Sequence, residues 1–351
     1  QDLLIVVLSL FNVVIVTAAL VALHRPGDDR FNMRPLRQAT FMIAQAAPLM
    51  LVLFFLFPRI GPLWTVPLKS QQAKTGMSEF MSPGDVSNLS RSGAVAFRVE
   101  FEGDVPPKSS LYWRGLVMSR LRQGTWSALN FYEAPASERR ENEPERVGEP
   151  LRYSVILEPT QQRWLYGLRY ARSTDSGVMQ SADYRLFRPL VIEDDYLYQV
   201  RSWPEAVLEP ELSDWRRRIE LGLPEGDNPR ARQLAMDIAA QASGPAEVVQ
   251  QVLDRFTLEP FVYTLQPPLL PEQNAMDAFL FDTRRGFCEH YASAFVIMMR
   301  AAGIPARVVA GYQGGEVNPV NGTVIVHQFD AHAWAEVWLE GEGWVRVDPT
   351  A

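Results

Sequence analysis

Residues 286–295, "GFCEHYASAF", contain the only cysteine of this 351-residue chain, Cys288. Gly286 permits a tight turn just before it, and the stretch "CEHYASAFVIMMRAA" predicts a helix that ends before Gly303 and Pro305. Cys288 is therefore expected in the first turn of that helix, where free N–H groups and the helix dipole favour a thiolate and should lower the thiol pKa. A lone cysteine is more often a small buried apolar residue, so its position alone does not decide between packing and chemistry.

The composition excludes several classes of protein. The chain is long enough for two globular domains, and 47% apolar with 21% charged residues is typical of a folded protein. A net charge of −7 gives no basic footprint for nucleic acid. One cysteine excludes an internal disulfide and a zinc site built from several thiolates. No phosphate loop, EF-hand loop or H-E-x-x-H helix occurs, so we expect no cofactor, no metal and no calcium requirement.

Two charge-free runs, residues 3–23 and 39–57, predict two transmembrane helices within residues 1–57. Each is long enough to cross an apolar layer of about 30 Å, and Pro48 in the second run is tolerated as a kink. The alternative is a pair of buried core helices. The connecting loop, residues 24–38, should be cytoplasmic by the positive-inside rule, which places the rest of the chain in the periplasm or another extracytoplasmic compartment. The predicted orientation rests on the four arginines of this loop, which are Arg25, Arg30, Arg34 and Arg37.

A β-rich domain is expected over residues 58–215. Short alternating runs fill residues 92–202, and "AVAFRVEFEG" sets apolar side chains on one face of a strand. A charged, proline-containing loop at 136–150 interrupts them. The pattern is consistent with a sandwich whose aromatic residues form its core, among them Trp113, Trp126 and Trp164.

The period changes after this region, and residues 216–351 are expected to form an α+β domain. Pro229 suits the first helical position behind Asn228, and later strands follow two or more helices. The chain begins with Gln1 rather than Met, so we interpret it as an internal fragment.

A hairpin is predicted in residues 329–350, "FDAHAWAEVWLEGEGWVRVDPT", which contain His332 and Asp348. These two residues could supply a base and its orienting carboxylate for the cysteine. A four-residue loop would put them on opposite faces of the sheet. A three-residue loop at 340–342 pairs Trp334 with Asp348 and makes His332 its diagonal neighbour, so we predict that loop or a bulge.

The other candidate residues are weaker. His290 on the helix points about 200° away from Cys288 and is expected to be structural or exposed. His327 is the reserve base, and Asp330 and Glu336 are reserve carboxylates. A metal site from the cysteine and two histidines lacks a fourth ligand and suitable geometry.

Three stretches then carry a resemblance: "GFCEHYASAFVIMMRAAGIPARVVAGYQGGEVNP", "DAHAWAEVW" and "GWVRVDPT". They closely resemble the bacterial transglutaminase-like family, and most closely its membrane-anchored periplasmic members of the TgpA type. The resemblance runs through nearly the whole chain, including "YWRG" and "LEPTQQRWL". It implies a papain-like core in which Cys288, His332 and Asp348 form a catalytic triad. Members of the family continue beyond the position of Ala351, which lies three residues after Asp348, so the resemblance implies that the catalytic domain is truncated at its C-terminus here.

The resemblance also implies a reaction. Cys288 would attack a glutamine side-chain amide, and a lysine or another amine would resolve the thioester, with protein or peptide substrates in the cell envelope as partners beside the lipid bilayer. The Cys288 N–H and a side-chain donor would bind the oxyanion, with Tyr263 a candidate and Trp334 a weaker one. Two alternatives stay open: a protease or amidase that uses water as the acceptor, and a non-catalytic envelope scaffold.

Overall fold

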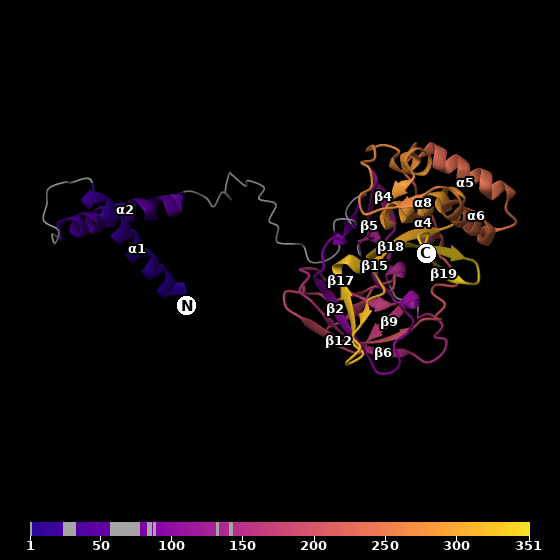
Figure 1. Ribbon diagram of the computed structural model, residues 1–351, viewed down its shortest axis with the longest axis horizontal. Helices are drawn as coiled ribbons and strands as arrows, with labels where there is room; N and C mark the ends of the chain where they lie inside the picture. The colour runs from indigo at the N-terminus through magenta and orange to yellow at the C-terminus, as the bar shows by residue number, and fades with distance from the viewer. Residues whose placement is uncertain are drawn as a thin grey trace. The chain divides into compact units, whose positions relative to one another are not determined.

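The computed structural model describes residues 2–23, 33–56, 78–82, 86, 89–130, 133–139 and 143–351. The chain separates into two compact units, residues 1–72 and residues 73–351 (Figure 1).

The first unit contains two helices, α1 (Asp2–Leu23) and α2 (Arg34–Leu56), which pack against each other. Pro48 lies inside α2. Helices are therefore confirmed at both predicted positions. In the part of the chain that the structure describes, no helix combines the length and apolar character needed to cross a membrane. Most of the predicted cytoplasmic loop, residues 24–32, lies outside the described residues.

The second unit is built around two antiparallel sheets. The six-stranded sheet has the order β16 (Glu316–Val317), β17 (Val324–His327), β2 (Val95–Phe101), β6 (Leu151–Leu157), β12 (Tyr196–Trp203) and β9 (Tyr170–Ser173). The five-stranded sheet has the order β19 (Gly343–Val347), β18 (Ala331–Leu339), β15 (Ala306–Gln313), β3 (Tyr112–Met118) and β8 (Gly167–Leu168).

Each of these sheets contains strands from both the β-rich part and the C-terminal part of the sequence. β17 from the C-terminal part pairs with β2, and β3 from the β-rich part pairs with β15. The predicted boundary at residue 215 therefore does not divide two separately packed bodies, because strand pairing joins the ranges 58–215 and 216–351 into one unit.

An aromatic core fills the space between the sheets. Phe97 on β2 meets Trp113 edge-on at 5.6 Å, Tyr166 face-on at 5.2 Å and Tyr312 edge-on at 5.4 Å between ring centroids. The aromatic core predicted for the β-rich region is confirmed. The face opposite β2, however, includes Tyr312 on β15, so the sandwich is closed by a strand of the predicted catalytic domain.

Helices pack on the same apolar face of the five-stranded sheet that carries Tyr312. α8 (Cys288–Ala301) packs on β18 and β15, and α5 (Pro229–Gln241) and α6 (Pro245–Leu258) pack on α8. Figure 1 shows α5 and α6 at one end of this unit and the six-stranded sheet at the other. Pro229 occupies the first helical position behind Asn228, as predicted.

The remaining elements are short. A further helix, α4 (Asp214–Glu220), precedes α5, and α7 (Ala275–Asp277) precedes α8. The minor strands are β1 (Phe80–Met81), β4 (Arg120–Arg122), β5 (Thr125–Ser127), β7 (Trp164–Leu165), β10 (Met179–Gln180), β11 (Leu186–Phe187), β13 (Val262–Tyr263) and β14 (Arg285–Gly286). Single turns are η1 (Lys108–Ser110), η3 (Ala136–Glu138), the π-helical η4 (Ala278–Thr283) and η5 (Gln328–Asp330).

Candidate active site

Cys288 is the first residue of α8, as the sequence predicts, and its side chain is 0% exposed. The turn before it requires Gly286, because a Cβ there would lie 2.6 Å from Phe279 and 2.8 Å from His290. β14, which contains Gly286, pairs in parallel with β13, so Tyr263 lies opposite Gly286. This pairing brings a tyrosine beside the start of the helix.

The hairpin has the predicted three-residue loop. Leu339 pairs with Gly343, which leaves residues 340–342 as the loop, and the register continued by one residue sets Trp334 opposite Asp348. His332 and Asp348 consequently share a face, and Nε2 of His332 lies 2.8 Å from Oδ2 of Asp348. The pairing predicted from loop length is confirmed.

The cysteine contacts the strand that carries the histidine. The backbone N–H of Ala333, the residue after His332, donates a hydrogen bond to the sulfur of Cys288. Because Asp348 engages Nε2 of His332, Nδ1 is the ring nitrogen left to exchange a proton. The arrangement places a thiol and an imidazole oriented by a carboxylate around one end of α8.

Each carboxylate oxygen of Asp348 takes part in two hydrogen bonds. Oδ2 also accepts a 2.7 Å hydrogen bond from the Tyr112 hydroxyl, and Oδ1 accepts from the backbone N–H and the hydroxyl of Thr350, at 3.0 and 2.7 Å. Burial raises the pKa of this carboxyl, but the hydrogen bonds and the attraction to His332 outweigh burial and lower the pKa to about 2. Asp348 is therefore a fixed anion that orients the imidazole.

The structure corrects one expectation about Cys288. The helix start was expected to lower its pKa, but burial raises the pKa of the thiol well above its usual value, and the neighbouring Glu289 carboxylate adds to the rise. The hydrogen bonds from Ala333 and Tyr263 act in the opposite direction. In this state the neutral thiol is the favoured form, so its proton must be removed by a base rather than released to solvent.

Tyr263 and Trp334, the two suggested oxyanion donors, have different surroundings. The Tyr263 hydroxyl is hydrogen-bonded to the Cys288 thiol and also receives the Cys288 backbone N–H, although 48% of the tyrosine is exposed. Trp334 is buried and packs against the rings of Tyr112 and His332, with centroids at 5.2 and 6.2 Å. Tyr263 alone of the two contacts the cysteine through its polar group.

The two other histidines lie outside this group. His290 is buried and structural rather than exposed, because its Nδ1 accepts the Phe287 N–H at 3.2 Å, and burial lowers its pKa to about 4. His327 is at the end of β17 in the six-stranded sheet, where its ring stacks on Phe329 at 4.8 Å. Asp330 accepts the His327 backbone N–H at 2.8 Å, so this pair caps a turn.

Glu336, the second reserve carboxylate, is committed to a buried ion-pair network. Its oxygens accept from Arg114 at 3.0 and 3.1 Å and from Arg307 at 2.8 Å. Burial raises its pKa, but the two guanidinium groups outweigh burial and lower the pKa to about 2. Arg114 comes from β3, so this network joins the two halves of the sequence.

Two contributions to the site were missed by sequence reasoning: the hydroxyl of Tyr112 and the amide of Gln313 that binds it. Tyr112 is 236 positions from Asp348, and its only signal is its place in the "YWRG" stretch. Within the described ranges, no group of three or more His, Cys, Asp or Glu side chains is arranged to hold a metal ion.

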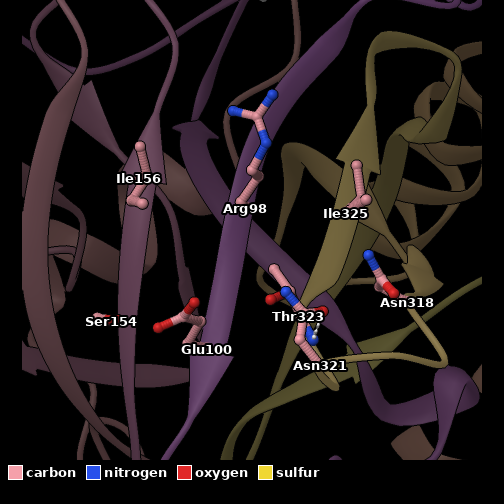
Figure 2. A pocket seen from close by; sticks show the side chains of 8 residues that line it. All are labelled: Arg98, Glu100, Ser154, Ile156, Asn318, Asn321, Thr323 and Ile325. Carbon is pink, nitrogen blue, oxygen red and sulfur yellow. Dashed lines mark hydrogen bonds between the residues drawn. The ribbon is translucent and has the colours of Figure 1, made fainter.

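A separate hollow lies on the outer face of the six-stranded sheet. Figure 2 shows Arg98 and Glu100 on β2 facing it, with Asn321 on the loop beside β17. The Thr323 backbone N–H donates to the Asn321 side chain at 3.2 Å, which stiffens that loop. The hollow contains no cysteine or histidine, so it does not compete with Cys288 as a site of nucleophilic chemistry.

Comparison with known proteins gives the family. Residues 1–209 match the TgpA N-terminal domain, and residues 232–349 match the transglutaminase-like superfamily. The chain belongs to the TgpA family. The predicted resemblance and the transglutaminase-like fold of the core are confirmed.

TgpA relatives include a Pseudomonas aeruginosa protein named protein-glutamine gamma-glutamyltransferase, which is 45% identical over 97% of this chain. The chain covers 51% of that protein, about half of its length. The crystal structure of the periplasmic domain of TgpA from Pseudomonas aeruginosa matches with a TM-score of 0.73 at 45% identity, covering 78% of this chain and 94% of that one. The same domain bound to ethylmercury matches with a TM-score of 0.74 at 46% identity, covering 78% of this chain and 96% of that one.

Proposed function

We propose that the chain transfers the acyl group of a glutamine side-chain amide to an amine through a thioester on Cys288. The observation that carries the proposal is the 2.8 Å hydrogen bond between His332 and Asp348, formed beside the residue whose N–H binds the Cys288 sulfur. The relative named protein-glutamine gamma-glutamyltransferase supports the choice of amide substrate.

In the first half-reaction Nδ1 of His332 takes the thiol proton as the Cys288 sulfur attacks the amide carbon. A carbon–sulfur bond forms, and the carbonyl electron pair moves onto oxygen. When this intermediate collapses the carbon–nitrogen bond breaks, and His332 returns the proton to the leaving nitrogen, which departs as ammonia. Asp348 keeps the imidazole oriented and stays ionised throughout.

In the second half-reaction an amine attacks the thioester. His332 removes a proton from the amine nitrogen, the new carbon–nitrogen bond forms, and the sulfur leaves and recovers its proton from His332. The sum is amide plus amine giving a substituted amide plus ammonia. General acid–base catalysis of this kind contributes about 10²–10⁴-fold.

The oxyanion of each intermediate is assigned to the N-terminus of α8. The Cys288 backbone N–H and the Tyr263 hydroxyl already face each other there, so a substrate oxygen that enters between them would accept from both. Burial, followed by the proximity of Cys288, raises the pKa of Tyr263, so its hydroxyl keeps the proton that it would donate. Trp334 remains the weaker candidate because its ring supports His332 and Tyr112.

The proposed setting is the bacterial cell envelope. The charge-free runs 3–23 and 39–57 and the arginines between them support an inner-membrane anchor, with residues 73–351 in the periplasm and envelope proteins or peptides as substrates. This part rests on the sequence and on the solved periplasmic domain of the relative, not on the described helices. Protease digestion of spheroplasts tests it: residues 73–351 should be cleaved without lysis, and full protection would refute the periplasmic placement.

The function is tested on the full chain with a glutamine donor peptide and a labelled primary amine. Mass spectrometry should detect the amine on the glutamine for the wild type and no product for Cys288→Ala. Alkylation of the single thiol is measured in parallel and should slow in His332→Ala, because the base that removes the thiol proton is lost.

Three outcomes would overturn the proposal. Deamidation or peptide cleavage without amine incorporation would assign a hydrolase. Incorporation that persists in Cys288→Ala would remove the cysteine from the mechanism. No product, with equally slow alkylation of wild type and His332→Ala, would favour the non-catalytic scaffold.

A further inference from the structure

A directional chain of hydrogen bonds reaches Asp348 through Tyr112, a residue of the β-rich part of the sequence. Nε2 of Gln313 donates to the Tyr112 hydroxyl at 2.8 Å, and that hydroxyl donates to Oδ2 of Asp348 at 2.7 Å. An amide nitrogen can only donate, so the Tyr112 oxygen accepts from Gln313 and its one proton is directed to Asp348. His332 binds the same carboxylate oxygen.

We propose that Tyr112 is a positioning residue that sets the orientation of Asp348 and, through it, of His332. With Tyr112 and His332 on Oδ2 and Thr350 on Oδ1, the carboxylate is held on both oxygens and cannot rotate away from the imidazole. Without the Tyr112 hydroxyl, one of the two groups that define the position of Oδ2 is lost. The inference rests on the proposed function, since it names a role within the same site.

The Tyr112 ring is itself fixed, which positioning requires. The residue is 6% exposed and lies on β3, where it pairs with Gln313 on β15. Its ring meets Trp334 edge-on at 5.2 Å, and the Arg346 guanidinium lies 3.9 Å from its centroid. A hydroxyl held by strand pairing and by packing on both sides loses little entropy when it binds the carboxylate.

This contact also gives the β-rich part a role in the chemistry. The residues that match the transglutaminase-like superfamily, 232–349, contain Cys288, His332 and Asp348 but not Tyr112. β3 lies next to β15 in the five-stranded sheet, so the N-terminal region contributes the Tyr112 hydroxyl to the site as part of that sheet. The site is thus incomplete in the superfamily core alone.

The test compares Tyr112→Phe with Tyr153→Phe in the full chain. Tyr153 is the matched control because its buried hydroxyl is also hydrogen-bonded, to Ser202 at 2.7 Å and to the Leu168 N–H at 2.9 Å, but it lies on β6 of the six-stranded sheet and not on a strand of the sheet that carries His332. For amine incorporation we expect Tyr112→Phe to lower kcat about tenfold, the loss of one hydrogen bond to a charged group, with KM within about twofold. Tyr153→Phe should leave both constants unchanged.

The direction of the hydrogen bonds from Gln313 through Tyr112 to Asp348 can be tested separately. In Gln313→Glu the new carboxylate accepts the Tyr112 proton and withdraws it from Asp348, so kcat should fall as in Tyr112→Phe. Gln313→Met removes the donor but leaves the Tyr112 proton on Asp348, so its kcat should stay within about threefold of the wild type. Equal kcat values for the two Gln313 variants would overturn the proposed direction.

Alkylation of Cys288 separates a failure of this inference from a failure of the proposed function. If the wild type incorporates amine and Tyr112→Phe matches Tyr153→Phe in kcat and alkylation rate, the positioning role is refuted and the function stands. If the wild type incorporates no amine, the function fails. A slower alkylation in Tyr112→Phe than in Tyr153→Phe would then still support the positioning role.

Discussion

The charge on Asp348 is a contribution to stability that depends on pH. Hydrogen bonds from His332, Tyr112 and Thr350 lower its pKa from the ordinary 3.8 to about 2, against the effect of burial. Because the folded-state pKa is the lower one, the stabilisation is fully present above about pH 4 and is lost as the pH falls toward 2. A shift of this size corresponds to about 2 kcal/mol.

Asp348→Asn tests this at the scale of one side chain. Urea denaturation should give a free energy of unfolding about 2 kcal/mol lower for the variant at pH 7, and the difference should narrow between about pH 4 and pH 2. Taking the difference between wild type and Asp348→Asn at each pH cancels the acid destabilisation that comes from all the other titrating groups. A difference that stays constant down to pH 2 would show that Asp348 does not stabilise the fold through its charge.

Single residues differ in how far the sequence predicts them. Cys288 and the His332–Asp348 pair were predicted because a helix start and strand alternation are local patterns, and the loop length decides which faces coincide. Tyr112 and Gln313 carry no such pattern, since the contact depends on β3 lying beside β15. The raised pKa of Cys288 was missed for the same reason: distant elements bury the thiol.

At the scale of the element, the hairpin depends on two glycines in left-handed conformation. Gly341 has φ +80° and, among the described residues, open space where a Cβ would lie. Gly343 has φ +70°, and a Cβ there would overlap the Leu208 carbonyl oxygen. That oxygen accepts the Trp344 N–H at 2.9 Å. Gly343 therefore permits both the turn and the close approach of a second segment.

Alanine at each glycine separates these two effects. Gly341→Ala should cost about 1 kcal/mol of unfolding free energy through backbone strain alone, and Gly343→Ala about 3 kcal/mol because the Leu208 carbonyl must also move. Amine incorporation should fall only in Gly343→Ala, since Gly343 begins the strand that leads to Asp348. Equal costs in urea denaturation would mean that the approach of Leu208 does not constrain the hairpin.

Elements were predicted well where their ends are marked locally. Pro229 behind Asn228 gave the start of α5, and Gly286 before Cys288 gave the start of α8. The pairing of β17 with β2 and of β3 with β15 was not predicted. Alternation shows which face of a strand is apolar but not which distant strand pairs with it.

At the scale of the whole molecule, residues 73–351 should unfold as one unit. Pairing of β3 with β15 and of β17 with β2 means that neither sheet is complete without both halves of the sequence. The predicted boundary at residue 215 followed a change in sequence period. A change in period reports local structure and carries no information on which strands share a sheet.

Phe97→Ala tests whether the unit unfolds cooperatively, starting from a residue of the six-stranded sheet. Phe97 is buried on β2 and contacts Trp113, Tyr166 and Tyr312, so its truncation should cost about 3–5 kcal/mol. Exposure of the Cys288 thiol to a labelling reagent and calorimetry then report on the catalytic side and on the whole unit. If the unit is cooperative, both midpoints shift down together.

The matched control is Leu197→Ala on β12, where the side chain is 61% exposed and truncation should change stability by less than about 0.5 kcal/mol. A Cys288 exposure midpoint that stays at the wild-type value in Phe97→Ala, while a separate calorimetric transition moves, would show that the two sheets unfold independently. The coincident shift is expected because the ring of Phe97 packs on Trp113 and Tyr312. Those two residues lie on the strands β3 and β15 that also hold Tyr112 and Gln313 beside Asp348, so damage to the aromatic core reaches the site through continuous strands.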